Sequence, residues 1–155
     1  MGVSGTGKTT VAELLAQKVQ LPCFDADDFH SDANKLKMKN GIPLTDEDRV
    51  EWLENLNQRL ISESKLKGAI LACSALKERY RQKLIENLEA RIIWVVLHGS
   101  FDLIYERMQK RKNHYMPASL LRSQFEAMEY PEYGIHVSID QSPEEIVNSI
   151  LHKTL

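Results

Sequence analysis

Residues 1–9 read M-G-V-S-G-T-G-K-T, and this stretch decides the fold. It matches the phosphate-loop pattern G-x-x-x-x-G-K-S/T. Glycines let backbone N–H groups come close to a phosphate, and the helix that follows adds the positive end of its dipole. The pattern therefore predicts nucleotide binding by Gly2, Ser4, Gly5, Thr6, Gly7, Lys8, Thr9 and Thr10.

Two residues of the loop have specific expected roles. Lys8 is expected to reach the β- and γ-phosphates as a mobile positive charge, which makes it a catalytic candidate, and the Thr9 hydroxyl is expected to bind Mg²⁺. The alternative is a glycine turn that merely precedes an amphipathic helix. Val11, Leu14 and Leu15 continue an apolar stripe at helical spacing directly after the loop, as the motif requires, and favour nucleotide binding.

A phosphate loop normally follows a buried strand, but only Met1 precedes Gly2 in this sequence. In related folds that strand is central, so its loss would leave backbone groups of both neighbours unpaired, at about 1–3 kcal/mol each. Two explanations are open. The strand lies upstream of Met1, or the chain is a shortened form that folds poorly or lacks activity. We favour the first.

Composition limits the function classes. The chain has 155 residues, 43% of them hydrophobic and 27% charged, with a net charge of −2, which fits one domain over residues 1–155. The charge balance argues against nucleic acid as a partner, and no apolar run approaches the roughly 18 residues of a membrane span. Cys23 and Cys73 lie in apolar stretches, so we expect two reduced, buried thiols in a cytoplasmic protein.

Strand and helix patterns alternate along the chain, which predicts a parallel sheet with helices on both faces. Unbroken apolar runs, such as residues 92–97, are typical of strands covered on both faces. We expect strands at 22–27, 69–73, 92–97 and 136–140, and helices at 7–20, 45–64, 74–81 and beyond, 100–111, from 117, and from 142. The fold class is α/β, with three α/β/α layers and the first strand apparently missing.

A polar cluster follows the first expected strand, and in open α/β sheets ligands bind at the carboxyl ends of strands. Its members are Asp25, Asp27, Asp28 and His30. Asp27 is the candidate to accept or orient the proton of an attacking hydroxyl, with Asp25 or His30 as alternatives. Asp27 or Asp28 could equally cap the next helix. Phosphate-loop proteins can hold their metal with an aspartate after a later strand, but Ser74 follows the strand at 69–73. Asp27 is therefore also a candidate to organise the metal through water.

Basic residues supply further candidates. Arg49 lies in the first turn of the helix that Thr45 and Asp48 open as a capping box, where a cation opposes the dipole and an anion would stabilise it. Lys77 and Arg81 are four residues apart on one helical face, which is either a ligand site or a solvated surface. Residues 107–115 hold five cationic or titratable basic groups, which form either a plain helix end or a lid over the phosphates.

Several segments together resemble the gluconokinases, small phosphate-loop kinases related to shikimate and adenylate kinases. Beyond residues 2–9 they include D-A-D-D-F-H at 25–30, N-x-x-K-M at 34–38, G-I-P-L-T-D-E-D-R at 41–49, C-S-A-L-K-E-R-Y-R at 73–81, R-M-Q-K-R-K-N-H-Y at 107–115 and Q-F-E at 124–126. Asn113 departs from the glycine typical of the family. Asn tolerates positive φ better than other non-glycine residues, so we expect the turn to be kept.

The resemblance implies ATP- and Mg²⁺-dependent phosphorylation of the 6-hydroxyl of D-gluconate, a five-stranded parallel core, a lid at about 107–129, and often a homodimer. On the matching positions it implies catalytic Lys8, Asp27 and Arg111, nucleotide contacts from Arg107 and Arg111, and substrate contacts from Asp27, His30, Arg49, Lys77, Arg81 and His114. The alternatives are a kinase of shikimate or another sugar acid, and a truncated nucleotide-binding protein without catalysis.

Overall fold

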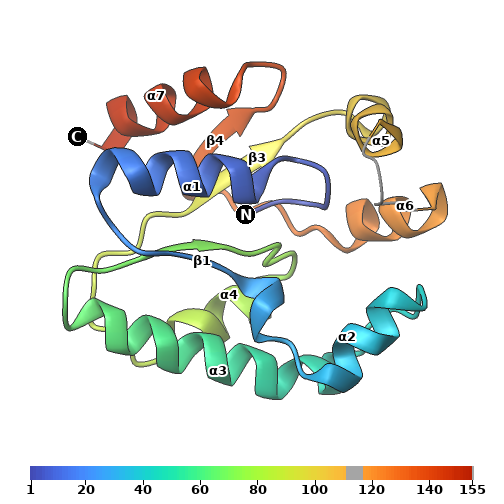
Figure 1. The fold of residues 1–155 in the computed structure, drawn as a ribbon, viewed down its shortest axis with the longest axis horizontal. Helices are drawn as coiled ribbons and strands as arrows, with labels where there is room; N and C mark the ends of the chain where they lie inside the picture. The colour runs from blue at the N-terminus through green and yellow to red at the C-terminus, as the bar shows by residue number, and fades with distance from the viewer. Residues whose placement is uncertain (111–116, 155) are drawn as a thin grey trace.

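The computed structural model describes residues 1–110 and 117–154, and its helices and strands alternate as the sequence predicts (Figure 1). The elements are α1 Lys8–Val19, β1 Cys23–Asp25, the 3₁₀ helix η1 Ala26–Phe29, α2 Asp32–Lys39, α3 Asp46–Ser64, β2 Ile70–Ala72, α4 Glu78–Ile85, β3 Val95–His98, α5 Phe101–Gln109, α6 Ala118–Ala127, β4 Ile135–Ser138 and α7 Pro143–Thr154. No helix in the described ranges has the length and apolar character to cross a membrane.

Side-chain caps fix the ends of several helices. Thr45 and Asp48 form the predicted capping box of α3, with Thr45 N donating to Asp48 Oδ2 at 2.9 Å and Asp48 N donating to Thr45 Oγ1 at 3.2 Å. Ser142 and Glu145 bond in the same reciprocal way at the start of α7. Ser100 caps α5 through Leu103 N at 3.3 Å. These predicted helix starts are confirmed.

The segment after β1 differs from expectation. Asp25, not Asp27 or Asp28, caps the next helical turn, because its Oδ1 accepts from Asp27 N at 3.0 Å and opens η1. The helix α2 follows and is capped by Ser31. Its sequence is polar and lysine-rich and carries no apolar stripe, so the pattern did not predict a helix there.

The strands form two parallel pairs, β1 with β2 and β3 with β4. Parallel pairing is confirmed, but the described residues do not form one continuous sheet. Between the pairs lies the start of the chain. Met1 N donates to Val95 O at 2.5 Å and Leu97 N donates to Met1 O at 2.9 Å, while Gly2 N donates to Ser74 O at 3.2 Å. Met1 and Gly2 thus occupy the end of a strand position between β2 and β3.

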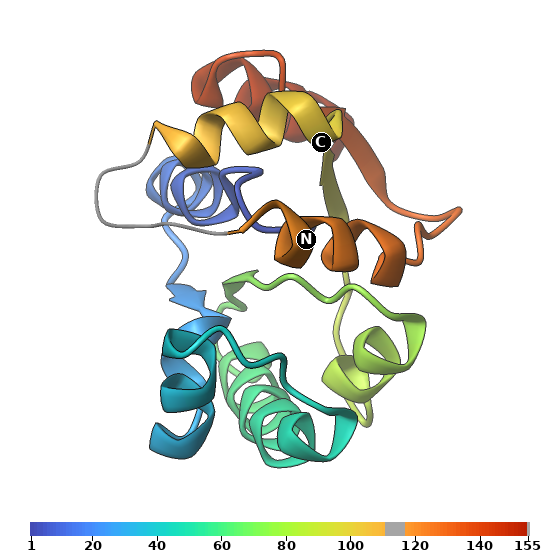
Figure 2. The same ribbon diagram turned by 90° about the vertical axis from the view of Figure 1, so that its right-hand side faces the viewer.

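Each strand pair has its own hydrophobic core. One core joins β3 and β4 to α1, α5, α6 and α7, and the other joins β2 to α3 and α4. In Figures 1 and 2 the two parts lie at opposite ends of the molecule, with the N-terminus between them. Met1 packs against both cores. Both cysteines are free thiols as expected; Cys73 is buried, but Cys23 is only half-buried, unlike the prediction.

Candidate functional site

The phosphate loop runs from Gly2 to Gly7 and leads into α1. Gly7 adopts φ 83°, a left-handed conformation that disfavours side chains, and it forms the N-cap of α1. Gly2 has φ 144° and lies so close to β3 that an added Cβ would be 2.5 Å from Leu97 O. The glycines at both ends of the motif are therefore required by the backbone path, and the predicted loop-to-helix geometry is present.

Contacts inside the loop hold its shape. The buried Thr6 donates from Oγ1 to Val3 O at 2.9 Å, and Lys8 Nζ donates to the same carbonyl oxygen at 3.0 Å. Lys8 therefore folds back over the loop, where its ammonium would meet a phosphate. Thr10 is exposed on the first turn of α1.

A residue that the sequence reasoning did not assign contacts the loop from α6. Gln124 Oε1 accepts from Ser4 N at 2.7 Å, and Gln124 Nε2 donates to Ser4 Oγ at 3.1 Å. These bonds link the phosphate loop to α6, which lies in the predicted lid range. Gln124 stood in a segment that resembles the family, but nothing in its sequence context indicated a contact with residue 4.

Thr9 on the first turn of α1 pairs with Asp25, the last residue of β1. Thr9 Oγ1 donates to Asp25 Oδ2 at 2.6 Å, which places a hydroxyl and a carboxylate oxygen together beside the loop. Among the described residues no group of three or more His, Cys, Asp or Glu side chains could hold a metal ion. Mg²⁺ in phosphate sites typically takes one or two protein oxygens and completes its shell with phosphate and water, so the Thr9–Asp25 pair fits that ion.

Asp27 and Lys8 both lie near the carboxyl end of β2. Burial raises the pKa of the Cys73 thiol to about 11; among the smaller contributions, Lys8 lowers this pKa and Asp27 raises it. Both charges are therefore close enough to Cys73, the residue after β2, to act on it. The structure thus brings Lys8, Thr9, Asp25 and Asp27 to one edge of the first strand pair.

His30 is buried beside Trp52. The two rings stack with centroids 4.4 Å apart, and Trp52 Nε1 donates to Ala26 O at 2.7 Å. Burial, followed by the charges of Arg49 and Lys35, lowers the pKa of His30 to about 4, so the ring is neutral at physiological pH. Its Nδ1 is buried and has no hydrogen-bond partner among the described residues.

Arg49 and Lys77 converge on Tyr80. The Arg49 guanidinium lies 5.4 Å from the Tyr80 ring centre, and the Lys77 ammonium lies 5.7 Å from it. Arg49 also donates to Leu44 O at 2.6 Å. Two of the three cations predicted to bind the substrate therefore lie together near the starts of α3 and α4, with Tyr80 as a partner that the sequence did not indicate.

An acidic residue holds this cluster together. Asp46 accepts a hydrogen bond from the Tyr80 hydroxyl, pairs with Arg79, and lies 3.7 Å from Lys77 Nζ. The hydrogen bond from Tyr80, followed by the nearby cations, lowers the pKa of Asp46. Asp46 therefore stays ionised and orients the first turn of α4.

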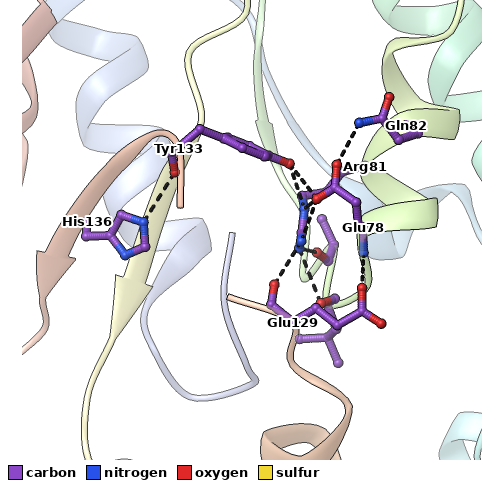
Figure 3. A network of polar contacts seen from close by, with 8 residues as sticks. Glu78, Arg81, Gln82, Glu129, Tyr133 and His136 are labelled. Carbon is purple, nitrogen blue, oxygen red and sulfur yellow. Dashed lines mark hydrogen bonds and ion pairs between the residues drawn. The ribbon is translucent and has the colours of Figure 1, made fainter. Parts of the chain in front are cut away.

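Arg81, predicted to bind the substrate, instead sits inside the protein with 1% of its surface exposed. Its guanidinium donates to three backbone oxygens, at Ala75, Leu76 and Glu129, at 2.8–3.2 Å. It also bonds the carboxylate of Glu78 and the hydroxyl of Tyr133, as Figure 3 shows. Every guanidinium nitrogen has a protein partner, so the geometry assigns Arg81 a structural role.

The remaining predicted residues lie elsewhere or outside the described residues. Arg107 on α5 donates to Ile139 O at 2.6 Å and so contacts the turn after β4. Arg111 and His114 fall within 111–116, outside the described residues. The nucleotide contacts predicted for Arg107 and Arg111, and the substrate contact predicted for His114, therefore remain predictions.

Comparisons with known proteins agree with this geometry. The shikimate kinase family model matches residues 4–154. A probable gluconokinase from Mus musculus is 43% identical over 171 aligned residues, covering 97% of this chain and 93% of its own. A gluconokinase from Arabidopsis thaliana is 40% identical and covers 97% of this chain and 88% of its own.

Solved structures show the same relationship. A gluconokinase from Sinorhizobium meliloti superposes with a TM-score of 0.89 at 40% identity, over 98% of this chain and 87% of its own. The shikimate kinase of Aquifex aeolicus, at 20% identity and a TM-score of 0.64, shares the fold. The predicted α/β phosphate-loop kinase fold is confirmed, and by sequence and structure this chain belongs to the gluconokinase family.

Proposed function

We propose that this protein transfers the γ-phosphoryl group of ATP to the 6-hydroxyl of D-gluconate. The observation that carries the proposal is that the phosphate loop and Asp27 lie at one edge of the first strand pair. Trp52, on which His30 stacks, bonds Ala26 O beside the same edge. Nucleotide and acceptor would thus meet at this edge of the β1–β2 pair. The names of the relatives support gluconate as the acceptor.

The loop amides and Lys8 would hold the phosphate groups, and the Thr9–Asp25 pair would hold Mg²⁺. When bound, Mg²⁺ offsets negative charge on the phosphate oxygens. Phosphoryl transfer depends on positioning and on charge stabilisation more than on covalent chemistry. Fixed amides and one mobile ammonium supply both without reorganising at the moment of reaction.

The acceptor side would use Asp27, His30, Arg49 and Lys77. Asp27 would accept or orient the proton of the attacking hydroxyl. The neutral His30, stacked on Trp52, would contact the acceptor from the same side. Arg49 and Lys77 would bind the gluconate carboxylate, since a planar guanidinium can hold a carboxylate at two points. Arg107, Arg111 and His114 would cover the reacting groups from the lid.

An acceptor screen tests the proposal. The protein is incubated with Mg²⁺ and ATP, and ADP release is measured with D-gluconate, shikimate and a series of other sugar acids and polyols. We expect gluconate to give the highest kcat/KM. A stronger response to shikimate or to another acid would replace the substrate. ADP release that no acceptor accelerates would favour nucleotide binding without phosphoryl transfer.

Replacing Arg49 with Ala is expected to raise the KM for gluconate about 10- to 100-fold, because a charge-assisted contact with the carboxylate is lost. The KM for ATP should change little. Arg59→Ala is the matched control, because Arg59 lies on the same helix and pairs with Glu63 at the surface. Steady-state kinetics with each substrate varied in turn make the measurement, and a larger change in the KM for ATP would contradict the assignment.

Substitutions of Asp25, the last residue of β1, and of Asp27, two residues later, are expected to change different kinetic properties. Asp27→Asn should lower kcat about 100-fold with little change in nucleotide affinity, because the proton acceptor is lost. Asp25→Asn should raise the Mg²⁺ concentration needed for half-maximal rate about tenfold, because the partner of Thr9 is weakened. Asp28→Asn, an exposed neighbour, serves as the control. An unchanged kcat in Asp27→Asn would remove Asp27 from the mechanism.

A further inference from the structure

The tip of the phosphate loop, formed by Ser4 and Gly5, is held by two helices that come much later in the chain. Gly5 has φ 82°, and an added Cβ there would lie 2.8 Å from Met108 Cγ and 2.9 Å from Ile104 Cγ2, so α5 packs directly against this glycine. Ser4 bonds twice to Gln124 on α6. Both helices lie beyond the loop in Figure 1. The tip is therefore fixed by residues outside the motif.

The two bonds determine how the Gln124 side chain is oriented. The Ser4 N–H can only donate, so the carboxamide oxygen faces it, at 2.7 Å. The carboxamide nitrogen then faces Ser4 Oγ at 3.1 Å, and because this nitrogen can only donate, Oγ is the acceptor. A hydroxyl that accepts in this way keeps its own proton for a second bond. Within residues 1–110 and 117–154, no oxygen of the protein accepts that proton.

The position of Lys8 shows which part of a nucleotide Ser4 faces. The Lys8 ammonium lies 3.0 Å from Val3 O, which belongs to the same peptide unit as Ser4 N. The lysine of this motif reaches the β- and γ-phosphates, so Ser4 lies at the γ-phosphate end of the loop. One face of this peptide unit thus bonds Lys8, and the other bonds Gln124.

The far end of α6 is anchored, so Gln124 reaches the loop from a fixed support. Met128, the residue after α6, is buried in the core that joins β3 and β4 to the neighbouring helices. Glu129 N donates to Leu76 O at 2.8 Å, and Glu129 Oε2 accepts from Glu78 N at 2.6 Å. A side chain on a rigid element holds its partner more precisely than one on a loop.

We propose that Gln124 is a positioning residue that favours nucleotides carrying a γ-phosphate. By donating to Ser4 Oγ, it leaves the Ser4 hydroxyl as a donor for a γ-phosphate oxygen. By accepting from Ser4 N, it holds the loop tip in place. A hydrogen bond to a charged oxygen is stronger than one between neutral groups, so its loss should weaken ATP binding more than ADP binding. This inference rests on the proposed function, because it concerns the nucleotide at the same loop.

Calorimetry with a non-hydrolysable ATP analogue and with ADP, each with Mg²⁺, tests the proposal. Ser4→Ala removes the donor and should weaken the ATP analogue about tenfold, with ADP changed less than about threefold. Gln124→Glu keeps the shape and the acceptor for Ser4 N. Its carboxylate, however, would accept the Ser4 proton itself and repel the phosphate. This variant should therefore bind the ATP analogue at least about tenfold more weakly, again with a smaller change for ADP.

The glutamate variant separates this role from simple support of the loop. Support alone predicts that Gln124→Glu, which keeps the bond from Ser4 N, binds both nucleotides as the unaltered protein does. It also predicts that Gln124→Ala weakens both nucleotides equally. Either result would overturn the proposal. The proposed role instead predicts that glutamate is worse than alanine for the ATP analogue.

Ser123→Ala is the matched control, because Ser123 is exposed on the same helix and donates to Leu120 O within it. It should bind both nucleotides like the unaltered protein. The ratio of the two affinities is measured within each variant, so a partly destabilised variant still gives a result. If the unaltered protein bound neither nucleotide, the proposed function itself would fail. Normal binding with an unchanged ratio in the Ser4 and Gln124 variants would overturn only the role of Gln124.

Discussion

Replacing Lys8 with Ala is expected to lower kcat/KM for phosphoryl transfer by roughly 100- to 1,000-fold while leaving Tm nearly unchanged. Lys8 is half-buried at the start of α1, and its ammonium lies 3.0 Å from Val3 O above the phosphate loop. Its removal takes away the one mobile charge that the motif directs at the phosphates. Alanine favours helix and fits the first turn of α1, so the fold should tolerate the change.

Lys18→Ala is the matched control for this prediction. Lys18 lies near the other end of α1 and bonds Asn148 Oδ1 at the surface, at 2.8 Å. Steady-state kinetics and thermal melts on both variants separate charge at the loop from general effects of losing a lysine from this helix. Equal activity in the two variants would mean that Lys8 does not act on the phosphates.

Replacing Arg81 with Met is expected to destabilise the fold by about 3–5 kcal/mol, because a buried, fully bonded cation is removed from its partners. The backbone oxygens of Ala75, Leu76 and Glu129 would lose their donors, and the carboxylate of Glu78 would lose its ion pair. For a chain of this size the corresponding fall in Tm is roughly 10 °C. Arg81→Lys should not restore stability, because one ammonium cannot serve all these oxygens.

Lys83→Met, on the same helix, is the control, because Lys83 pairs with Glu86 at the surface. Denaturant unfolding gives the free energies, and kinetics give the second readout. A structural Arg81 predicts loss of stability and a loss of activity not confined to one substrate. If Arg81→Met kept its Tm and raised only the KM for gluconate, Arg81 would be a substrate ligand and the structural assignment would be wrong.

Local signals in the sequence predicted much of the fold. The phosphate loop, the four strand positions and the capping boxes at Thr45 and Ser142 depend on residues close together in the chain, and the structure confirms them. The site candidates Lys8, Thr9 and Asp27 follow from the same kind of signal. Asp27 reaches the site because it follows the carboxyl end of β1, and Lys8 and Thr9 reach it from the first turn of α1.

Contacts between distant segments could not be predicted in this way. Arg81 shares its helical face with Lys77, but its burial depends on Glu129 and Tyr133, about fifty residues away. The pairing of Gln124 with Ser4 spans 120 residues. The pairing of Thr9 with Asp25 depends on how α1 packs beside β1. Spacing in the sequence does not determine any of these.

Some predictions concern residues or properties that the described part of the chain does not show. Arg111 and His114 lie in 111–116, so their predicted roles in the lid stay predictions. Assembly as a homodimer and a cytoplasmic location also stay predictions.

Calorimetric titration with a non-hydrolysable ATP analogue and Mg²⁺ tests the central claim most directly, because it measures binding at the phosphate loop without requiring an acceptor. The account predicts one-to-one binding by the protein and by its Lys18→Ala variant, and binding at least tenfold weaker by Lys8→Ala. The absence of measurable binding by the unaltered protein, or equal affinity in Lys8→Ala, would contradict the account.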